Sequence, residues 1–319
     1  MSLVLLFSPQ GSQAVGMGRD LAESSARARA VFDAADRELG WSVSATCWNG
    51  PAERLDDTRQ TQPALLTTSI AALRALEERA TATPAVLAGH SVGEYAALVA
   101  AGVLELEAAL RLVARRGELM AAVDVEGGMS AVIGLDRGAV DSAVAAVGRP
   151  TELVVANDNA PGQVVISGLF GALEAAEERL REAGARRVIR LPVSGPFHSP
   201  LMADVAEALA TAFERETWRD ASVPVMSNVT AEPVSDAGRI RALLAEQVRS
   251  PVEWTRSVER MAADGVDLAL ELGAGSALIG MVRRIAPGIR ASAVADVAGL
   301  DEAIRVLRDA AAPAVAAGS

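Results

Sequence analysis

One serine of the chain stands in a pattern that makes a hydroxyl group a nucleophile. Ser91 is the centre of a G-x-S-x-G sequence at 89–93. A strand-like run at 85–89 precedes it, and a helical stretch at 92–101 follows. In such a strand–turn–helix the glycines permit a sharp turn that raises the serine above the sheet. The turn also places Ser91 at a helix N-terminus, where free amides and the helix dipole stabilise developing negative charge.

A serine hydroxyl needs a base beside it, and the chain has two histidines, His90 and His198. Adjacent side chains of a tight turn point apart, so we expect His90 to face the scaffold. His198, in the sequence S-G-P-F-H-S at 194–199, is therefore the predicted base. The alternative is a surface histidine without a role in a proline-rich loop.

The composition excludes several other chemistries. The chain has no lysine, which removes Schiff-base chemistry, pyridoxal phosphate anchoring and a phosphate-loop lysine. One cysteine and two histidines are too few for a disulfide framework or a thiolate or imidazole zinc site. A formal net charge of -11 argues against nucleic-acid binding. We therefore expect no metal, no cofactor and no nucleic-acid partner.

No apolar segment predicts a membrane span. Half of the residues are apolar, enough for a sizeable core. The best candidate span, 96–110, is interrupted by Glu105 and Glu107. The apolar run at 2–7 lacks a basic leader and is typical of a first buried strand. We expect a cytoplasmic protein without a membrane partner, and a monomer, because nothing indicates an obligate oligomer.

The elements that must position Ser91 alternate between strand-like runs and helical periodicity, which is typical of an α/β domain with a mostly parallel sheet. The expected strands of this part are 3–7, 85–89, 223–227 and 268–272, and the expected helices before the change of rhythm are 20–39, 69–79 and 92–101.

The pattern changes between residues 126 and 195 to β-α-β-β-α-β, the split ferredoxin-like unit. Its expected strands are 129–135, 153–156, 164–167 and 187–191, with helices at 137–147 and 170–183 and a turn-rich segment at 157–162. We predict a large α/β-hydrolase-like domain of residues 1–125 and 196–319, with a small ferredoxin-like domain of residues 126–195 inserted in it. The cleft between them is the expected substrate site. We expect the tail at 311–319 to fray.

Ordered motifs along the chain resemble those of malonyl-CoA:acyl carrier protein transacylases and of the acyltransferase domains of polyketide and fatty acid synthases. The matching segments are T-Q-P-A-L at 61–65, G-H-S-V-G-E at 89–94, R-G at 116–117, N-A-P-G-Q at 159–163, F-H-S at 197–199, S-N-V at 227–229 and P-V-E-W at 251–254. The opening F-S-P-Q-G-S-Q at 7–13 resembles the family's F-P-G-Q-G-S-Q but has Pro9 where the family has glycine.

The resemblance implies roles for the residues around Ser91 and His198. The backbone amides of Gln10 and Val92 would form the oxyanion hole. The backbone carbonyl of Gln247 would orient the histidine. Asn159 and Asn228 are expected to be turn and structural residues.

The resemblance also implies three substrate-binding residues. Arg116 would grip the free carboxylate of a malonyl group with its planar guanidinium. Gln62 would line the same pocket, and Phe197 would narrow it beside the base, excluding a branch at the α-carbon of the acyl group. The alternatives are an exposed helix arginine, a core or turn glutamine, and a phenylalanine that only packs the loop.

The implied reaction moves a malonyl or related acyl group from an acyl-CoA donor, through a serine ester, to the phosphopantetheine thiol of an acyl carrier protein, in fatty acid or polyketide biosynthesis. An acidic carrier would need a basic patch, for which 186–190 or 283–284 are candidates. Three alternatives stay open: a transferase taking a non-malonyl group from another carrier protein, a hydrolase that clears carrier-protein thioesters, and a non-catalytic docking subunit.

Overall fold

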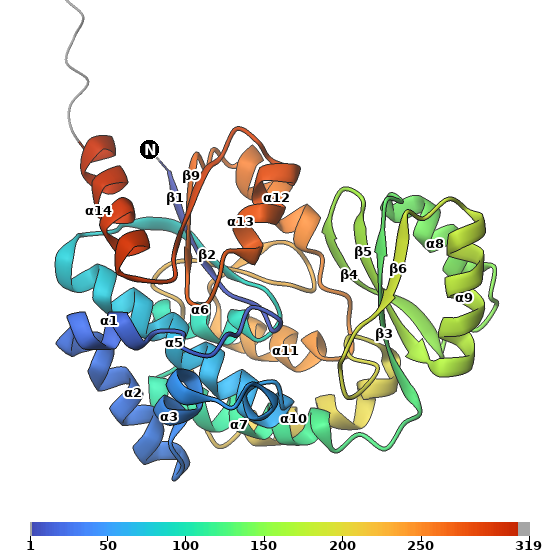
Figure 1. Cartoon of the computed structure of the whole chain (residues 1–319), viewed down its shortest axis with the longest axis horizontal. Coiled ribbons are helices and arrows are strands. Elements are labelled where there is room, and N and C mark those ends of the chain that lie inside the picture. The colour runs from blue at the N-terminus through green and yellow to red at the C-terminus, as the bar shows by residue number, and fades with distance from the viewer. Residues whose placement is uncertain (1, 312–319) are drawn as a thin grey trace, which may run out of the picture.

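The computed structural model describes residues 2–311 and contains two separate β-sheets (Figure 1). The larger has six strands in the order β10-β9-β1-β2-β7-β8, all parallel to their neighbours except β8. Its strands are β1 Leu3–Phe7, β2 Pro84–Gly89, β7 Val225–Met226, β8 Pro233–Val234, β9 Leu268–Leu272 and β10 Arg290–Val294. The predicted mostly parallel sheet is confirmed.

Helices cover both faces of this sheet because its central strand is apolar on both sides. In β1 the side chains alternate: Leu5 and Phe7 join one buried cluster, and Val4 and Leu6 the other. The first face is covered by α1 Arg19–Ser24, α2 Ala26–Leu39, α3 Val43–Asn49, α4 Ala52–Leu55, α5 Thr58–Arg79, α6 Gly93–Ala100, α7 Leu106–Ala121, α10 Ala203–Phe213, α11 Ala237–Gln247 and α14 Val297–Ala311. The second is covered by α12 Trp254–Ala263 and α13 Ala277–Ile285.

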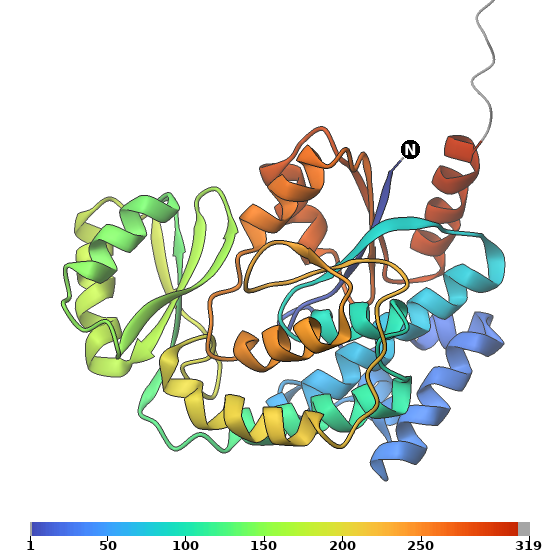
Figure 2. The ribbon, with the colours of Figure 1, turned by 180° about the vertical axis from the view of Figure 1, so that it is seen from behind.

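The smaller sheet is antiparallel, with strand order β4-β5-β3-β6, and lies to one side of the larger one (Figures 1 and 2). Its elements in chain order are β3 Gly127–Ile133, α8 Arg137–Ala145, β4 Leu153–Ala160, β5 Gln163–Leu169, α9 Phe170–Glu182 and β6 Arg187–Arg190. Helices α8 and α9 pack on its outer face. This is the predicted ferredoxin-like β-α-β-β-α-β unit; the exact domain limits at 126 and 195 stay predictions.

The small sheet is tied to the rest of the chain through its edge strand β4. Asn157 forms a parallel bridge with Val252, in the segment between α11 and α12. The Val252 amide donates to Ala156 O at 2.8 Å, and the Asp158 amide donates to Val252 O at 3.0 Å. The two parts of the molecule are therefore joined by backbone hydrogen bonds close to the C-terminal end of α11.

This pairing corrects one sequence prediction. The turn expected at 157–162 is wrong, because β4 continues to Ala160 and only Pro161 and Gly162 separate it from β5. Polar residues in 157–159 mimic a turn signal, yet their backbone groups pair with β5 on one side and with Val252 on the other.

Two helix predictions also need correction. Helix α5 begins at Thr58 instead of residue 69, since Asp57 caps it by accepting from the Arg59 amide and the helix passes through Pro63. The helix expected over 20–39 is divided at Ser25, whose hydroxyl accepts from the Ala28 amide at 3.0 Å and starts α2. Strands β8 and β10 were not predicted.

Within residues 2–311 no helix combines the length and the hydropathy that crossing a bilayer requires. Of the tail predicted to fray, 312–319 lies outside the described residues.

Candidate active site

The nucleophile lies in a strained turn between β2 and α6. Ser91 has φ 52, a left-handed conformation that is unusual for a residue with a side chain. A Cβ added to Gly89 would lie 2.0 Å from Gly93 C, and one added to Gly93 would lie 2.2 Å from Phe7 O. Both positions therefore require glycine, since any side chain would push the helix away from the strands that hold it.

Ser91 and His198 meet across 107 positions of sequence, with Oγ and Nε2 2.9 Å apart. The other ring nitrogen, Nδ1, faces two backbone carbonyls, Gln247 O at 2.9 Å and Ser250 O at 3.2 Å. Because carbonyls only accept, Nδ1 carries the proton of the neutral ring, and Nε2 is free to accept the proton of Ser91. The Gln247 carbonyl therefore contacts the ring of His198, as the resemblance implied.

The ring of His198 is held neutral by its surroundings. Burial, and next the positive charge of Arg116, lower the pKa of His198 to about 3. Only 4% of the residue is exposed. The base form is therefore the resting form at neutral pH.

His90 makes a different set of contacts from His198. Its Nε2 hydrogen-bonds Asn159 Oδ1 at 2.8 Å, and its ring packs against Trp254 with centroids 5.5 Å apart. Burial lowers the pKa of His90 to about 4. These contacts join the turn before Ser91 to strand β4, so Asn159 lies in a strand and not in the turn we expected.

Arg116 is buried directly beside the nucleophile, with 1% of its surface exposed. Its Nη2 donates to Ser91 Oγ at 3.0 Å and to Gln247 Oε1 at 3.1 Å, and its Nη1 donates to Gln62 Oε1 at 2.8 Å. The alternative of an exposed helix arginine is wrong for Arg116. It does describe Arg115, which pairs with Glu118 at the surface.

The two glutamines hold this guanidinium from both sides. Gln62, fully buried in α5, accepts from Arg116 and faces Met120 Sδ with its Nε2 at 3.3 Å. The Gln247 side chain accepts from Arg116 and donates to Ser91 O at 3.0 Å. Gln247 therefore contacts base, guanidinium and nucleophile, although the sequence prediction concerned only its backbone carbonyl.

Two residues that sequence reasoning did not assign to the site complete it. Asn228 Oδ1 accepts from the Ser91 amide at 2.6 Å, while its Nδ2 donates to Gly89 O at 2.6 Å. Glu94 Oε2 accepts from Gln247 Nε2 at 2.8 Å and from the Asn228 amide at 3.2 Å. The signals that could have found them are the S-N-V and G-H-S-V-G-E sequences.

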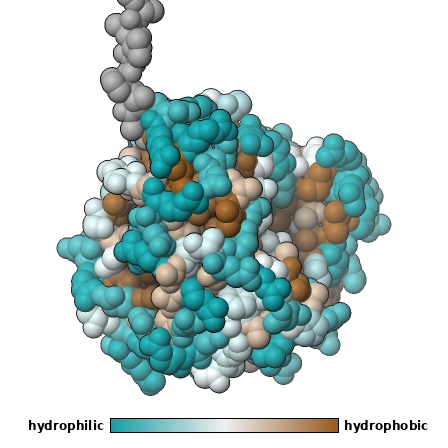
Figure 3. Space-filling view, turned by 60° about the vertical axis from the view of Figure 1, so that its left-hand side comes forward, coloured by the Kyte–Doolittle hydropathy of each residue, from teal (hydrophilic) through white to brown (hydrophobic). Residues whose placement is uncertain are grey.

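A cavity of about 560 Å³ opens onto Ser91 and His198. Gln10 and Phe197 line it, and an apolar wall extends from the nucleophile, formed by Met120, Met129, Ala131, Val165, Leu191 and Val193. Hydrophobic side chains are visible where the smaller part of the molecule faces the larger (Figure 3). A cavity therefore lies where we expected the cleft; that it is the substrate site stays a prediction.

Two backbone amides beside this cavity have no partner. Within residues 2–311 neither the Gln10 nor the Val92 amide donates a hydrogen bond. Val92 directly follows the nucleophile, and Gln10 lies on the loop after β1. Free amides next to a serine are what an oxyanion hole requires.

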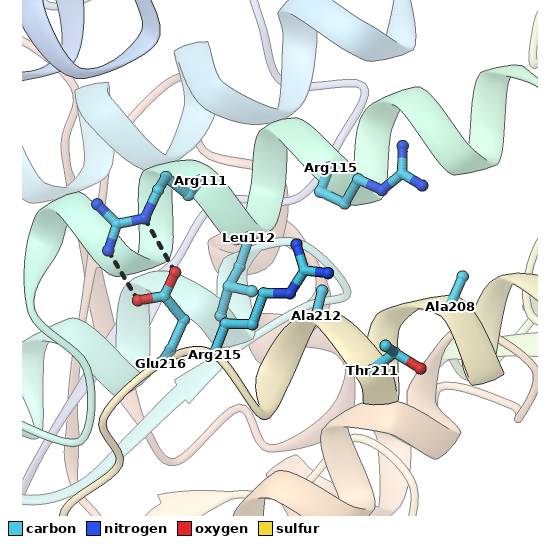
Figure 4. A pocket seen from close by; sticks show the side chains of 8 residues that line it. All are labelled: Arg111, Leu112, Arg115, Ala208, Thr211, Ala212, Arg215 and Glu216. Atoms are coloured by element: carbon cyan, nitrogen blue, oxygen red, sulfur yellow. Dashed lines mark hydrogen bonds and ion pairs between the residues drawn. The ribbon is translucent and has the colours of Figure 1, made fainter.

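A second depression, between α7 and α10, lacks this chemistry (Figure 4). Its volume is about 420 Å³. Arg111 on its rim is neutralised by Glu216 and Glu38, at 2.7 and 2.6 Å. The residues that line it include neither a histidine nor a serine.

A serine at a strand–helix elbow, hydrogen-bonded to a neutral histidine and followed by a residue with an unpaired amide, is typical of enzymes that work through a serine ester. Residues 4–305 match the family model described as acyl transferase domain. The chain therefore belongs to the acyl transferase domain family and is an acyltransferase.

Similar proteins cover nearly the whole chain. It is 42% identical over 310 residues to the malonyl CoA-acyl carrier protein transacylase of Bacillus subtilis strain 168, covering 96% of this chain and 98% of that one. It is 41% identical to the protein of the same name from Escherichia coli strain K12, covering 94% and 98%.

Solved structures agree with these relatives. An acyl carrier protein S-malonyltransferase from Vibrio cholerae has a TM-score of 0.92 and 42% identity, covering 95% of this chain and 100% of that one. A malonyl-transacylase in complex with its type II PKS acyl-carrier protein has a TM-score of 0.92 and 40% identity, covering 96% and 100%.

Proposed function

We propose that the protein transfers a malonyl group from coenzyme A to the phosphopantetheine thiol of an acyl carrier protein, in fatty acid or polyketide synthesis. The observation that carries this proposal is Arg116, whose guanidinium lies buried 3.0 Å from Ser91 Oγ. A buried positive charge at the nucleophile suits an acyl group that has a free carboxylate. Relatives of more than 40% identity bear the name of this activity.

The first half-reaction forms a serine ester. His198 Nε2 takes the proton of Ser91 Oγ as the oxygen attacks the thioester carbonyl. The Gln10 and Val92 amides donate to the oxyanion of the tetrahedral intermediate. The carbon–sulfur bond then breaks, and coenzyme A leaves as a thiol with the proton from His198.

The second half-reaction runs the same path in reverse. His198 takes the proton of the pantetheine thiol, and the sulfur attacks the ester carbonyl. The bond to Ser91 Oγ breaks, and the oxygen recovers the proton from His198. Each step uses the same base and the same two amides, so the chain's own residues suffice for the reaction, and we propose that it uses no metal or cofactor.

The acyl pocket is built from residues around Arg116. In our proposal the carboxylate of the malonyl group replaces Ser91 as the partner of Nη2 when the ester forms. Gln62 and Gln247 keep the guanidinium in place. Phe197, which lines the cavity beside His198, limits the width at the α-carbon.

The rim of the cavity offers basic groups for an acidic carrier protein. Arg284 on α13 hydrogen-bonds Gln163, a residue of the cavity wall, and Arg187 lies on β6, which ends directly before the wall residue Leu191. Arg190 is already paired with Glu177 at 2.8 Å. Arg187 and Arg284 are exposed. We propose that the carrier docks across this rim and that the protein works as a monomer in the cytoplasm.

Intact-mass measurement tests the proposal. Malonyl-CoA should add the mass of one malonyl group to the protein. After holo carrier protein is added, that mass should disappear from the protein and appear on the carrier. Ser91→Ala should form no adduct. An adduct lost to water at the same rate without carrier would indicate a thioester hydrolase. A wild-type protein that forms no adduct would indicate a carrier-protein donor or a docking subunit.

A further inference from the structure

Glu94 is a buried carboxylate beneath the nucleophile for which the reaction has no direct use. Only 4% of the residue is exposed, and it does not line the cavity. Its Oε2 accepts from Gln247 Nε2 at 2.8 Å and from the Asn228 amide at 3.2 Å. Burying a carboxylate costs free energy of desolvation, so we expect Glu94 to have a function at this position.

The contacts of Gln247 supply that reason. A side-chain amide has an accepting end and a donating end, and the two can exchange by a rotation of the terminal bond. Arg116 can only donate, and it meets Oε1 at 3.1 Å. Glu94, when ionised, can only accept, and it meets Nε2. The two charged groups therefore select the same orientation of one amide.

That orientation matters for two residues of the site, Arg116 and Ser91. With Oε1 toward Arg116, the guanidinium is held where Nη2 reaches Ser91 Oγ. With Nε2 toward Ser91, the amide also supports the carbonyl of the nucleophile at 3.0 Å. A rotated amide would present an NH₂ group to a guanidinium, which would repel it from this position.

We propose that Glu94 is a positioning residue: its carboxylate fixes the orientation of the Gln247 amide and thereby holds Arg116 where it receives the carboxylate of the acyl group. This inference rests on the proposed role of Arg116. Glu94 touches no reacting atom in this scheme, so its removal should act on acyl-group selection more than on ester formation itself.

Protonation of Glu94 would weaken the selection, because a carboxylic acid can also donate. Burial raises the pKa of Glu94 to about 7, although hydrogen bonds and the charge of Arg116 oppose this. The other titratable group facing it is Tyr95 on the same helix, which stays neutral because burial raises its pKa. Helix α11 and the loop at Asn228 present only amides to Glu94.

The test compares malonyl-CoA with acetyl-CoA as donors for wild type, Glu94→Gln and the surface control Glu118→Gln. We expect Glu94→Gln to lower kcat/KM for malonyl about tenfold, the effect of one charge-assisted hydrogen bond. Acetyl transfer should change less than twofold, and the control should match wild type. Arg116→Ala combined with Glu94→Gln should lose no more malonyl transfer than Arg116→Ala alone.

The pH dependence of the malonyl-to-acetyl ratio of kcat/KM distinguishes a positioning role of Glu94 from a role in stabilising the fold alone. In wild type the malonyl-to-acetyl ratio should rise with pH through about 7, the pKa of Glu94, and in Glu94→Gln it should be flat. This wild-type measurement stands even if the variant folds poorly. Equal losses for both donors, additive effects with Arg116→Ala, or a flat wild-type ratio would each overturn the inference. None of them would affect the malonyl adduct on Ser91, which tests the proposed function separately.

Discussion

Replacing Arg116 by alanine tests the carboxylate-binding role most directly. The change removes a guanidinium that makes three hydrogen bonds, to Gln62, Ser91 and Gln247. It leaves His198 and its carbonyl partners in place, because none of them depends on Arg116 for a hydrogen bond, whereas Ser91 Oγ loses one of its two hydrogen-bond partners and keeps His198. The malonyl carboxylate would then enter a buried site without a positive charge.

The size of the effect follows from this burial. Leaving one member of a buried ion pair without its partner costs about 3–5 kcal/mol. Since about 1.4 kcal/mol corresponds to a factor of ten, kcat/KM for malonyl-CoA should fall roughly 100- to 4,000-fold. An acetyl group has no carboxylate and loses nothing of this kind, so its transfer should stay within about tenfold of wild type, the cost of one lost hydrogen bond.

The assay is single-turnover acylation of Ser91, followed by intact mass with malonyl-CoA and acetyl-CoA in separate reactions. The matched control is Arg115→Ala, one residue earlier on the same helix, where the side chain is exposed and pairs with Glu118. Urea unfolding of both variants measures the stability that the buried bonds of Arg116 contribute, so that only folded protein is compared.

Two results would refute the reasoning. Malonyl transfer at the rate of the Arg115→Ala control would show that Arg116 does not bind the carboxylate. Equal losses of malonyl and acetyl transfer would show that Arg116 serves Ser91 or the fold and selects no acyl group. Only the loss confined to malonyl agrees with the contacts of the guanidinium.

Three further predictions follow. Phe197→Leu should raise transfer of methylmalonyl relative to malonyl about tenfold, the usual weight of one methyl group, in a competition between the two CoA esters; an unchanged ratio would leave Phe197 a packing role. Arg187→Glu with Arg284→Glu should raise the KM for carrier protein about two- to fivefold per exposed charge and leave Ser91 acylation unchanged, whereas Arg308→Glu on α14 should alter neither. His198 and His90, with folded pKa values of about 3 and 4 against 6.5 when unfolded, contribute stability above pH 6.5 that is lost on acidification. Burial raises the folded pKa of Glu94 from 4.5 to about 7 and also raises that of Glu271, so both carboxyl groups oppose this loss. In urea titrations between about pH 7 and pH 4.5, Glu94→Gln should therefore lose more stability on acidification than wild type, and an equal pH dependence of the two proteins would contradict the raised pKa of Glu94.

The nucleophile and its base were predictable from sequence for different reasons. The elbow around Ser91 is a local event, since its glycines, the strand before it and the helix after it are adjacent in the chain. His198 lies 107 positions away, and only the scarcity of histidine singled it out. A chain with ten histidines would have left the base undetermined by the same reasoning.

The role of Arg116 could not be predicted from its position in the sequence alone. It stands in a helix beside Arg111 and Arg115, and its sequence neighbourhood alone does not separate it from them. Helix α7 turns Arg116 toward Ser91 and the other two toward surface glutamates, a difference of about 100° per residue around the axis. The packing of α5 and α10 against α7 determines which side of α7 faces the site. The residues around Arg116 in the sequence contain no information on this packing.

Strand β4 could not be predicted in full because one of its two partners, Val252, is distant in sequence. Turn residues normally leave the backbone to solvent, yet here the Asp158 amide donates to Val252 O and the Val252 amide donates to Ala156 O, across nearly a hundred positions. The segment 157–160 is strand because it pairs with β5 along its length and, at Asn157, also with Val252. It also brings Asn159 to His90 and so attaches the small sheet to the elbow.

The segment Ser8-Pro9 departs from the family's motif, and contacts of its own hold the loop. Proline removes an amide, but Gln10 keeps its own, and Pro9 O accepts from the Ser12 amide at 3.3 Å to form a turn. Ser8, fully buried, donates to Glu271 Oε1 at 3.3 Å, and the other oxygen of Glu271 accepts from the Ile279 amide at the start of α13. The family's proline at this position has no hydroxyl for such a bond. The loop is therefore anchored to β9 and α13 by a contact of its own, which leaves the Gln10 amide unpaired beside the cavity.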